Sequence, residues 1–324
     1  MVAAVPPLLT ARGITPEMLV TAIRDAKIEP CVLSASPATS RLARLPCPGV
    51  CLDFASVGPA LRITGEMPAK AYSLLFVDVC PRPGRSLNFA IEHLDGYIGL
   101  FAPGGTVDAL TPAGYATASL SVPEALFHEA LAAHSLDLPA HVLRSGIGLS
   151  IDPAAQARLR LLLHEIERVL WEDPEVFQEM PARCAVETEL IAAFLSAIRC
   201  SWPTMRPHAT RTGGRLRRLG QACDFLAAHA REPIQLSDLC AELGLTERGV
   251  EQLFRDLLGL SPIAYLRHLR LHGARQALRN TPATSGSVKR IALEWGFWHL
   301  GRFASQYRTL FGESPSTTIA RPTG

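Results

Sequence analysis

The hydrophobic pattern changes along the chain, and each change predicts a different kind of structure. In residues 47–121, short apolar or alternating runs are separated by turn-forming clusters such as Pro81-Arg82-Pro83-Gly84. The runs predict strands at residues 50–54, 72–79, 86–91, 97–101 and 116–122. Repeated short strands with turn residues between them are typical of an antiparallel β-sandwich or small barrel.

The residues on either side of this region complete a β-rich domain that we place at residues 1–152. Residues 1–45 carry little periodic pattern. Thr15-Pro16-Glu17 predicts the start of a short helix that runs to Lys27, because proline is favoured at the first helical position. Residues 123–134 have a helical pattern.

Residues 153–200 change to a helical period and predict two helices, with Pro153 in the first turn of the first one. The apolar positions are Leu159, Leu162, Leu163, Ile166, Val169 and Leu170 in the first helix, and Val186, Leu190, Phe194, Leu195 and Ile198 in the second. Both stripes can pack on the β-rich domain, or the helix pair can also mate with its copy in a dimer. Residues 201–215 hold two prolines and two adjacent glycines, which predicts an interdomain linker.

Residues 216–262 predict three helices, the last two of which form a helix-turn-helix. Helices are expected at 216–230 and 236–243, and Gly244 forms the turn because a left-handed residue lets the next helix cross steeply. Thr246 can cap that next helix through its hydroxyl. Its inward positions are Val250, Leu253, Phe254 and Leu257, which leaves Glu247, Arg248, Glu251, Gln252 and Arg255 on its outer face.

The same pattern occurs a second time after a long helix at 263–278. Ser287 can cap a helix, Gly296 forms the turn, and Phe303, Tyr307, Leu310 and Phe311 face inward. Each copy ends in Gly-x-Ser-Pro, at residues 259–262 and 312–315. An internal repeat of this kind is much more specific than one helix-turn-helix.

The charge distribution agrees with a polyanionic partner for the repeated region. Residues 211–324 carry 16 Lys and Arg against 9 Asp and Glu, whereas residues 1–210 carry 16 against 21. The net charge of +2 therefore combines a basic C-terminal third with an acidic remainder.

Residues 216–320 resemble the DNA-binding domain of AraC/XylS-type transcriptional regulators. The first copy carries Leu243-Gly244-Leu245-Thr246-x-Arg248-x-Val250-x-Gln252-x-Phe254, and the second carries Ile291-Ala292-x-x-x-Gly296-Phe297, Phe303-x-x-x-Tyr307-Arg308 and Phe311-Gly312-x-Ser314-Pro315. Three features depart from the family pattern. Gly249 lies inside the first recognition helix, His299 stands where the family usually has a small capping residue, and the end lacks the common Tyr-Arg.

The resemblance implies binding to double-stranded DNA, with one recognition helix of each copy in the major groove. Arg can pair with guanine, Gln with adenine and Glu with cytosine, so we expect Arg248, Glu251 and Gln252 to read bases. In the second copy, the positions that match the reading face of the family are Leu300, Gly301, Arg302 and Ser305. Arg255, Arg270, Lys289 and Arg308 are expected to contact phosphates.

The resemblance also implies that the N-terminal domain, in this family often a cupin-like β fold, senses a small effector and dimerises. RNA polymerase is a further expected partner. A cupin metal site would need His-x-His with further ligands, and Glu92-His93 stands alone between the expected strands. We expect no metal, no cofactor and no catalytic residue.

Two alternatives remain open for the N-terminal part. Some regulators with this DNA-binding domain carry a zinc-bound cysteine for DNA repair, and Cys47-Pro-Gly-Val-Cys51 is the only close cysteine pair. The domain could also bind only a protein partner. The effector site stays unknown.

The composition agrees with a multidomain α+β protein. The 324 residues, 48% hydrophobic and 19% charged, are enough for two or three domains with sizeable cores. No apolar run approaches the length of a membrane span, and the N-terminus lacks the pattern of a secretory signal. Eight scattered cysteines are typical of reduced thiols, so we expect a cytoplasmic protein.

Overall fold

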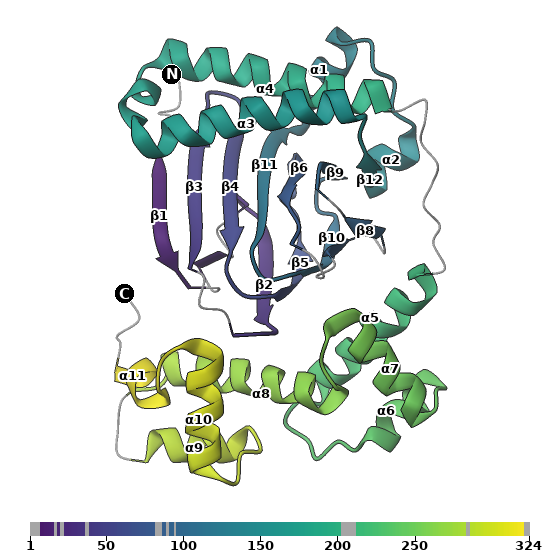
Figure 1. Ribbon diagram of the computed structural model, residues 1–324, viewed down its shortest axis with the longest axis vertical. Helices are drawn as coiled ribbons and strands as arrows, with labels where there is room; N and C mark the ends of the chain where they lie inside the picture. Colours follow the sequence, from purple (N-terminus) through teal and green to yellow (C-terminus); the bar gives the residue numbers. More distant parts are fainter. Residues whose placement is uncertain are drawn as a thin grey trace. The chain divides into compact units, whose positions relative to one another are not determined.

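The structure divides into two compact units. The computed structural model describes residues 7–15, 18–19, 23–35, 39–81, 86–88, 91–93, 95–201, 212–282 and 286–320 (Figure 1). Unit 1 contains Met1–Pro30 and Ser36–His208, and unit 2 contains Cys31–Ala35 and Ala209–Gly324. Residues 202–211 of the expected linker lie outside the described residues, and the expected bounds 201–215 are too wide, because Ser201 ends helix α4 and Thr212 begins helix α5.

Unit 1 is built on two antiparallel sheets. In spatial order, the larger sheet consists of β1 (Leu9–Ile14), β3 (Ser40–Pro46), β4 (Cys51–Val57), β11 (Tyr115–Pro123), β6 (Ala71–Val79), β9 (Tyr97–Phe101) and β12 (Ile147–Ser150). The smaller sheet consists of β2 (Lys27–Val32), β5 (Leu61–Glu66), β10 (Thr106–Thr111), β7 (Ser86–Asn88) and β8 (Ile91–His93). Ile28 of β2 and Val107 of β10 pack with Phe101 of β9, so the two sheets face each other as a sandwich.

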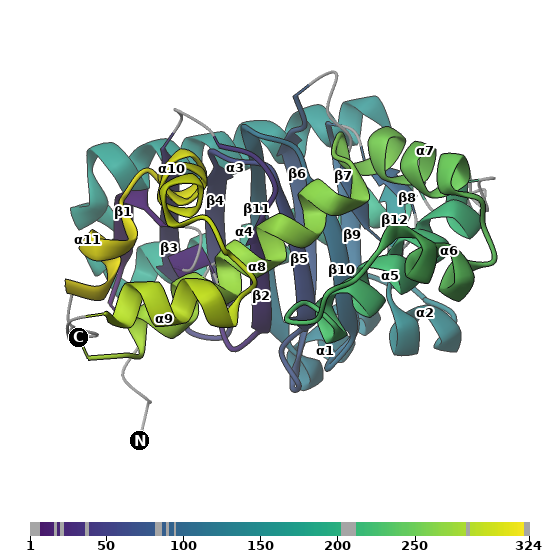
Figure 2. The same ribbon diagram turned by 90° about the horizontal axis from the view of Figure 1, so that it is seen from below.

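The other face of the larger sheet is covered by helices. They are α1 (Glu124–Ala133), α2 (Ala140–Ser145), α3 (Pro153–Glu172) and α4 (Met180–Ser201), and a 3-10 turn (Pro174–Gln178) joins the last two. Figures 1 and 2 show α3 and α4 running across the strands. Leu163 and Phe194 belong to one buried cluster with Leu52 and Phe54 of β4. The expectation that both apolar stripes pack on the β-rich domain is therefore confirmed.

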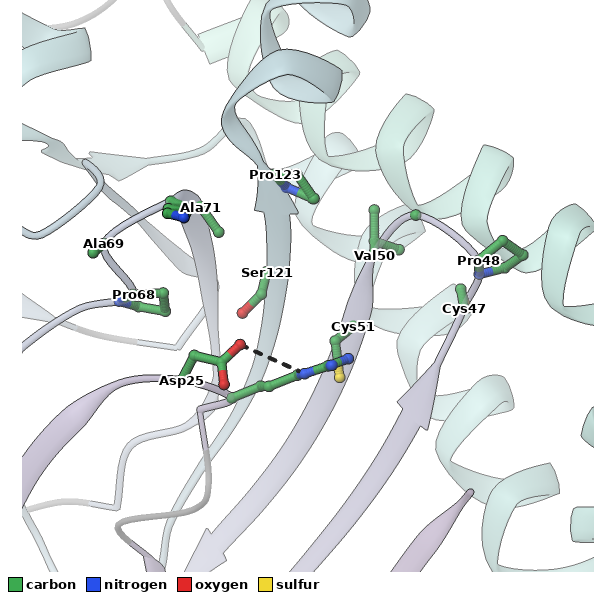
Figure 3. Close-up of a pocket in the computed structure, with 13 residues that line it drawn as sticks. Asp25, Cys47, Pro48, Val50, Cys51, Pro68, Ala69, Ala71, Ser121 and Pro123 are labelled. Atoms are coloured by element: carbon green, nitrogen blue, oxygen red, sulfur yellow. Dashed lines mark ion pairs between the residues drawn. The ribbon is translucent and has the colours of Figure 1, made fainter. Parts of the chain in front are cut away.

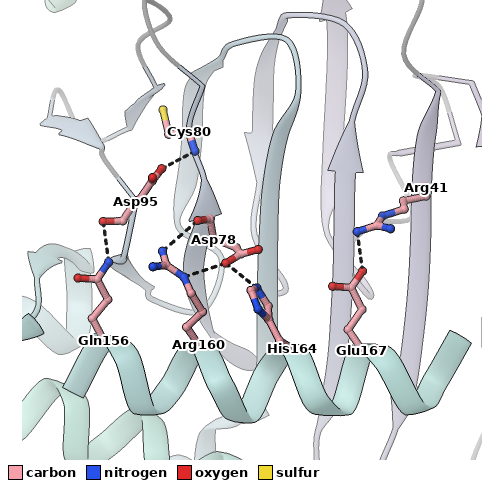
Figure 4. A network of polar contacts seen from close by, with 8 residues as sticks. All are labelled: Arg41, Asp78, Cys80, Asp95, Gln156, Arg160, His164 and Glu167. Atoms are coloured by element: carbon pink, nitrogen blue, oxygen red, sulfur yellow. Dashed lines mark hydrogen bonds and ion pairs between the residues drawn. The ribbon is translucent and has the colours of Figure 1, made fainter. Parts of the chain in front are cut away.

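Polar side chains add to the attachment of α3. Arg160 donates through Nε to Asp78 Oδ1 of β6 at 3.0 Å, and His164 lies 2.9 Å from the same oxygen (Figure 4). Glu167 forms an ion pair of 3.1 Å with Arg41 of β3. These contacts hold α3 on the same strands that its apolar stripe covers.

The expected multidomain α+β fold, with a β-rich N-terminal part and a helical C-terminal part, is confirmed, but several strands were missed. The helix expected from Thr15 to Lys27 is wrong where this stretch is described, because Lys27 begins β2 and Asp25 has a φ of 61°. β1, β2 and β3 lie in the region that carried little pattern. β1 is an edge strand with mostly exposed side chains, so it shows no alternation. The run at 86–91 is split into β7 and β8, and Glu92-His93 lies within β8 rather than between strands.

Unit 2 is helical and contains the expected repeat. After α5 (Thr212–Ala228), the first copy consists of α6 (Leu236–Leu243) and α7 (Glu247–Leu258), and the second of α9 (Ser287–Glu294) and α10 (Leu300–Phe311). The long helix α8 (Pro262–Arg279) joins the copies (Figure 2). A short helix α11 (Pro315–Ala320) was not expected, because the Gly-Glu-Ser-Pro segment reads only as a stop.

The two turn glycines adopt the left-handed conformation that the repeat requires, with φ of 60° at Gly244 and 76° at Gly296. The caps differ between the copies. Thr246 Oγ1 accepts a hydrogen bond of 3.2 Å from the N–H of Gly249, as expected. His299 occupies the corresponding position before α10 and makes no side-chain cap. The capping role expected for Ser287 is wrong, because Gly286 occupies the cap position of α9 and Ser287 is the first helical residue.

A buried polar network joins α8 to the end of the second copy. Arg275 of α8 forms an ion pair of 3.0 Å with Glu313, and both side chains are at least 86% buried, with exposed fractions of 7% and 14%. Thr318 of α11 donates to Glu313 Oε1 at 3.0 Å and accepts a bond of 2.8 Å from Tyr307 of α10. The network fixes α10 and α11 to α8.

Alanine substitution of the turn glycines should separate backbone strain from crowding. An L-residue in the left-handed conformation costs about 1–2 kcal/mol, and at Gly244 no atom lies within 4 Å of an added Cβ. At Gly296 the Cβ would also come within 3.2 Å of the Arg270 guanidinium. We expect Gly296→Ala to lower the free energy of unfolding more than Gly244→Ala in urea denaturation. Equal losses would show that Arg270 moves aside without cost.

Candidate functional site

The first recognition helix, α7, has one buried and one exposed face. Val250, Leu253 and Phe254 point into unit 2 and are at most 3% exposed. Arg248 and Gln252 are exposed on the opposite face, and Glu251 is partly exposed beside them. The three residues expected to read bases therefore lie together on the outer face of α7.

Glu251 and Gln252 of α7 are engaged in surface pairs within the helix. Glu251 forms an ion pair of 3.1 Å with Arg255, and Gln252 Nε2 lies 3.3 Å from Asp256 Oδ1. Within the part of the chain that the structure describes, the Arg248 side chain forms no hydrogen bond or ion pair. Exposed pairs of this kind contribute about 0–1 kcal/mol, so the groups can exchange them for a ligand at little cost.

The second recognition helix, α10, has the same division into faces. Phe303 and Tyr307 are buried, whereas Leu300, Gly301, Arg302 and Ser305 are exposed. Leu300 has an exposed fraction of 38%. Nothing lies within 4 Å of a Cβ added to Gly301, so this position leaves open space on the outer face.

Three of the four residues expected to contact phosphates are exposed, and the fourth is used within the domain. Arg255, Lys289 and Arg308 are exposed near the recognition helices. Arg270 donates through Nε to Ala230 O at 2.7 Å and through a terminal nitrogen to Glu232 O at 2.6 Å, and burial lowers its pKa. Its guanidinium is thus held against the protein, and we propose no phosphate contact for it.

Sequence reasoning missed a cleft of about 470 Å³ beside α10. Trp298, in the turn before α10, is 77% exposed and lines the cleft together with Arg267 of α8 and Arg302. A tryptophan in the turn between Gly296 and the recognition helix was the available signal, since tryptophan is enriched at interfaces.

Unit 1 contains a cavity of about 90 Å³ between its two sheets. Most of the lining is apolar, and it includes Ile28, Ile63, Met67, Leu75, Phe101 and Val107. Asp53 is a buried carboxylate in this lining, and burial raises its pKa to about 6 although Arg44 Nε lies 2.5 Å from Oδ1. A separate cleft of about 590 Å³ is lined by Ser121, Cys51 and Lys70, among others (Figure 3).

The cysteine pair offered as a repair site is poorly suited to that chemistry. Burial raises the pKa of both Cys47 and Cys51 to about 12, whereas the nucleophile that accepts a methyl group is a thiolate. The eight cysteines are free, and the described residues hold no group of three or more His, Cys, Asp or Glu able to bind a metal ion.

Among the described helices, none has the length and apolar character needed to span a bilayer.

Two outward polar faces on helices that follow glycine turns define a DNA-binding helix-turn-helix domain. Residues 239–321 match the family described as a helix-turn-helix domain. The "Probable thc operon regulatory protein" of Rhodococcus erythropolis is 38% identical over 98 residues, which are 30% of this chain and 30% of that protein. The "XylDLEGF operon transcriptional activator 2" of Pseudomonas putida is 38% identical over 97 residues, 30% of this chain and 61% of that protein.

A solved structure shows the same similarity. A "probable AraC family transcriptional regulator from Rhodopseudomonas palustris CGA009" is 37% identical, covers 33% of this chain and 99% of its own, and has a TM-score of 0.31. The C-terminal part of this chain is a double helix-turn-helix domain of AraC/XylS type.

The missing cap of α10 gives a prediction for stability. A serine at position 299 would supply the hydroxyl that the first N–H groups of α10 lack, and such caps contribute about 1 kcal/mol. We expect His299→Ser to raise the midpoint of urea unfolding of the full chain, and Thr246→Ala to lower it by a similar amount. No gain from His299→Ser would mean that the imidazole or water already satisfies these donors.

Proposed function

We propose that the protein is a sequence-specific transcription regulator that reads two successive major-groove segments of double-stranded DNA with α7 and α10. The observation that carries this proposal is the repeat itself, because two helices with exposed polar faces are joined by one continuous helix, α8. A fixed connection of this kind suits half-sites roughly 10 bp apart on one face of the duplex. The two curated relatives are named as an operon regulatory protein and an operon transcriptional activator, which supports the proposal.

Each exposed side chain has a base partner that suits its chemistry. Arg248 and Arg302 can donate two hydrogen bonds to guanine, and Gln252 can pair with adenine. Glu251 can accept from cytosine once it leaves Arg255, and Leu300 can contact a thymine methyl group. Gly301 and Ser305 allow the backbone of α10 to approach the groove closely. Arg255, Lys289 and Arg308 supply phosphate contacts that add affinity without sequence information.

Removal of the Arg302 side chain should relax specificity at one base-pair position. We expect Arg302→Ala to weaken binding to a selected site by about 1–3 kcal/mol and to affect random duplexes much less, as measured by fluorescence anisotropy. Arg168→Ala is the matched control, because it removes one exposed arginine from α3 of unit 1. Equal weakening on selected and random duplexes would argue against base reading by Arg302.

The phosphate contacts should appear in the salt dependence of binding. Each phosphate that a cation neutralises contributes about −0.9 to the slope of log K against log salt concentration. We expect Lys289→Ala and Arg308→Ala each to reduce the magnitude of the slope by about 1 and to weaken all duplexes alike. A slope unchanged in both variants would remove these residues from the interface.

We further propose that unit 1 senses a small effector in the cavity between its sheets and passes the signal to DNA binding. Support comes from the apolar lining of this cavity and from the buried carboxylate of Asp53.

Dimerisation through α3 and α4 is a part of the same proposal, since Leu161 on the outer side of α3 is 71% exposed. RNA polymerase is the proposed protein partner, and the proposed location is the cytoplasm.

A thermal-shift screen distinguishes effector sensing from control by a protein partner alone. A ligand present at 100 times its Kd should stabilise the full chain by about 2.7 kcal/mol. If no small metabolite raises the unfolding temperature, unit 1 is better assigned to protein recognition.

A further inference from the structure

The inner face of the larger sheet carries a row of polar side chains. The register of β11 against β4 places Ser119 opposite Asp53, and the register of β11 against β6 places Ser121 opposite Ser73. Residues directly opposite each other in neighbouring strands project to the same face, and Ser119 and Ser121 share a face because side chains alternate. Asp53, Ser73, Ser119 and Ser121 therefore form one polar row across three adjacent strands.

The row lacks the hydrogen bonds that buried polar groups normally make. Asp53 is 1% exposed, and the three serines have exposed fractions of 0%, 3% and 7%. Among the described residues, Asp53 Oδ2 and the three serine hydroxyls have no hydrogen-bond partner. A buried polar group without a hydrogen bond destabilises the fold, and even isolated examples are rare, so four in one row require an explanation.

The row extends from the cavity to the cleft. Asp53 and Ser119 line the cavity between the sheets, whereas Ser121 lines the cleft in Figure 3. A molecule in the cavity would thus have apolar walls along its body and the polar row at one end. This arrangement suits a ligand with an apolar body and a single polar head.

The charges around the row decide which head fits. Asp53 Oδ1 is already paired with Arg44, so Oδ2 is the acceptor that remains. A carboxylate can only accept hydrogen bonds, and it repels a second anion. Arg24 also acts on Asp53 through its backbone N–H and its charge, and its guanidinium pairs with Asp25 at 3.6 Å. Arg44 and Arg24 thus each have a carboxylate partner, whereas Oδ2 of Asp53 is a buried acceptor that still lacks a donor. The row therefore favours a head that donates hydrogen bonds.

We propose that Asp53, Ser119 and Ser121 of the polar row bind the head group of the effector, and that this head is a hydrogen-bond donor without negative charge, an ammonium or a hydroxyl. The apolar body of the ligand lies among Ile28, Met67 and Phe101 of the cavity. The inference rests on the proposed control by a small effector, and it specifies the chemical class of that effector.

Three probes with the same six-carbon body test the head group. Hexylamine, hexan-1-ol and hexanoate are titrated into the full-length protein by calorimetry, with thermal shift as a second readout. We expect the amine to bind most tightly, the alcohol more weakly, and hexanoate not at all. The preference between amine and alcohol identifies which of the two donor heads the row selects.

Two variants and one control connect the preference to the row. Asp53→Asn should weaken the amine at least tenfold and remove its advantage over the alcohol, because it replaces a charged acceptor with a neutral one. Ser119→Ala should weaken both ligands and raise the stability of the free protein, since it deletes an unsatisfied hydroxyl. Asp108→Asn is the control, because it breaks the Arg62 ion pair of 2.9 Å at a half-exposed carboxylate outside the cavity lining.

Several results would overturn the inference. Binding of hexanoate as tight as that of hexylamine would show that the cations of the cleft dominate. Equal binding of the amine to the wild type and Asp53→Asn would place the head elsewhere, and no binding of any probe would assign the row to water. Selection of DNA fragments by the same protein preparations distinguishes failure of the head-group inference from failure of the DNA-binding proposal. If fragments are selected but no probe binds, only the head-group inference fails. If no fragment is selected, the DNA-binding proposal itself fails.

Discussion

The buried ion pair between Arg275 and Glu313 is the interaction on which the geometry of unit 2 most depends. It joins α8 to the segment that follows α10, and Thr318 and Tyr307 extend it by hydrogen bonds to both neighbouring helices. Removal of either partner would leave a buried charge without compensation, which is far more costly than loss of a surface pair. Arg270, one turn earlier in α8, binds two carbonyl groups that follow α5. The same helix is thus fastened to the segment before the first copy and to the segment after the second, and its Tyr265 packs edge to face on Phe254 of α7. These contacts make the spacing of the recognition helices a property of α8.

Unit 1 uses the two-residue period of a strand to serve two purposes with one sheet. In β4, Leu52 and Phe54 point to α3 and α4 and complete the main core. Asp53, Ala55 and Val57 point to the other sheet and line the cavity. The stability of the sheet comes mainly from the first face, so the second face can carry polar groups and open space. This division explains how the domain tolerates a row of unsatisfied oxygens.

The sequence was sufficient for unit 2 and insufficient for much of unit 1. In unit 2 the apolar period, the left-handed glycines and the repeated Gly-x-Ser-Pro ends act over a few residues, so they could be recognised without tertiary information. The edge strand β1 could not, because its exposed side chains follow no alternation. The hydrogen bonds of Arg270 were missed because they depend on carbonyl groups 38 and 40 positions away. The polar row depends on strand register, and residues 53, 73 and 119 become neighbours only when β11 lies between β4 and β6.

The difference between the caps of α7 and α10 has a consequence for the order of events on DNA. The first turn of α7 is held by Thr246, whereas α10 begins with Leu300 and Gly301 after an uncapped His299. The first turn of each helix contains a glycine, Gly249 in α7 and Gly301 in α10, so the cap is what distinguishes them. An uncapped turn frays more readily, and in the proposed complex with DNA its ordering would consume part of the interaction free energy. In the proposed complex the two halves of the repeat would therefore meet DNA with unequal preorganisation, and α7 would form the more rigid template against which α10 completes its first turn.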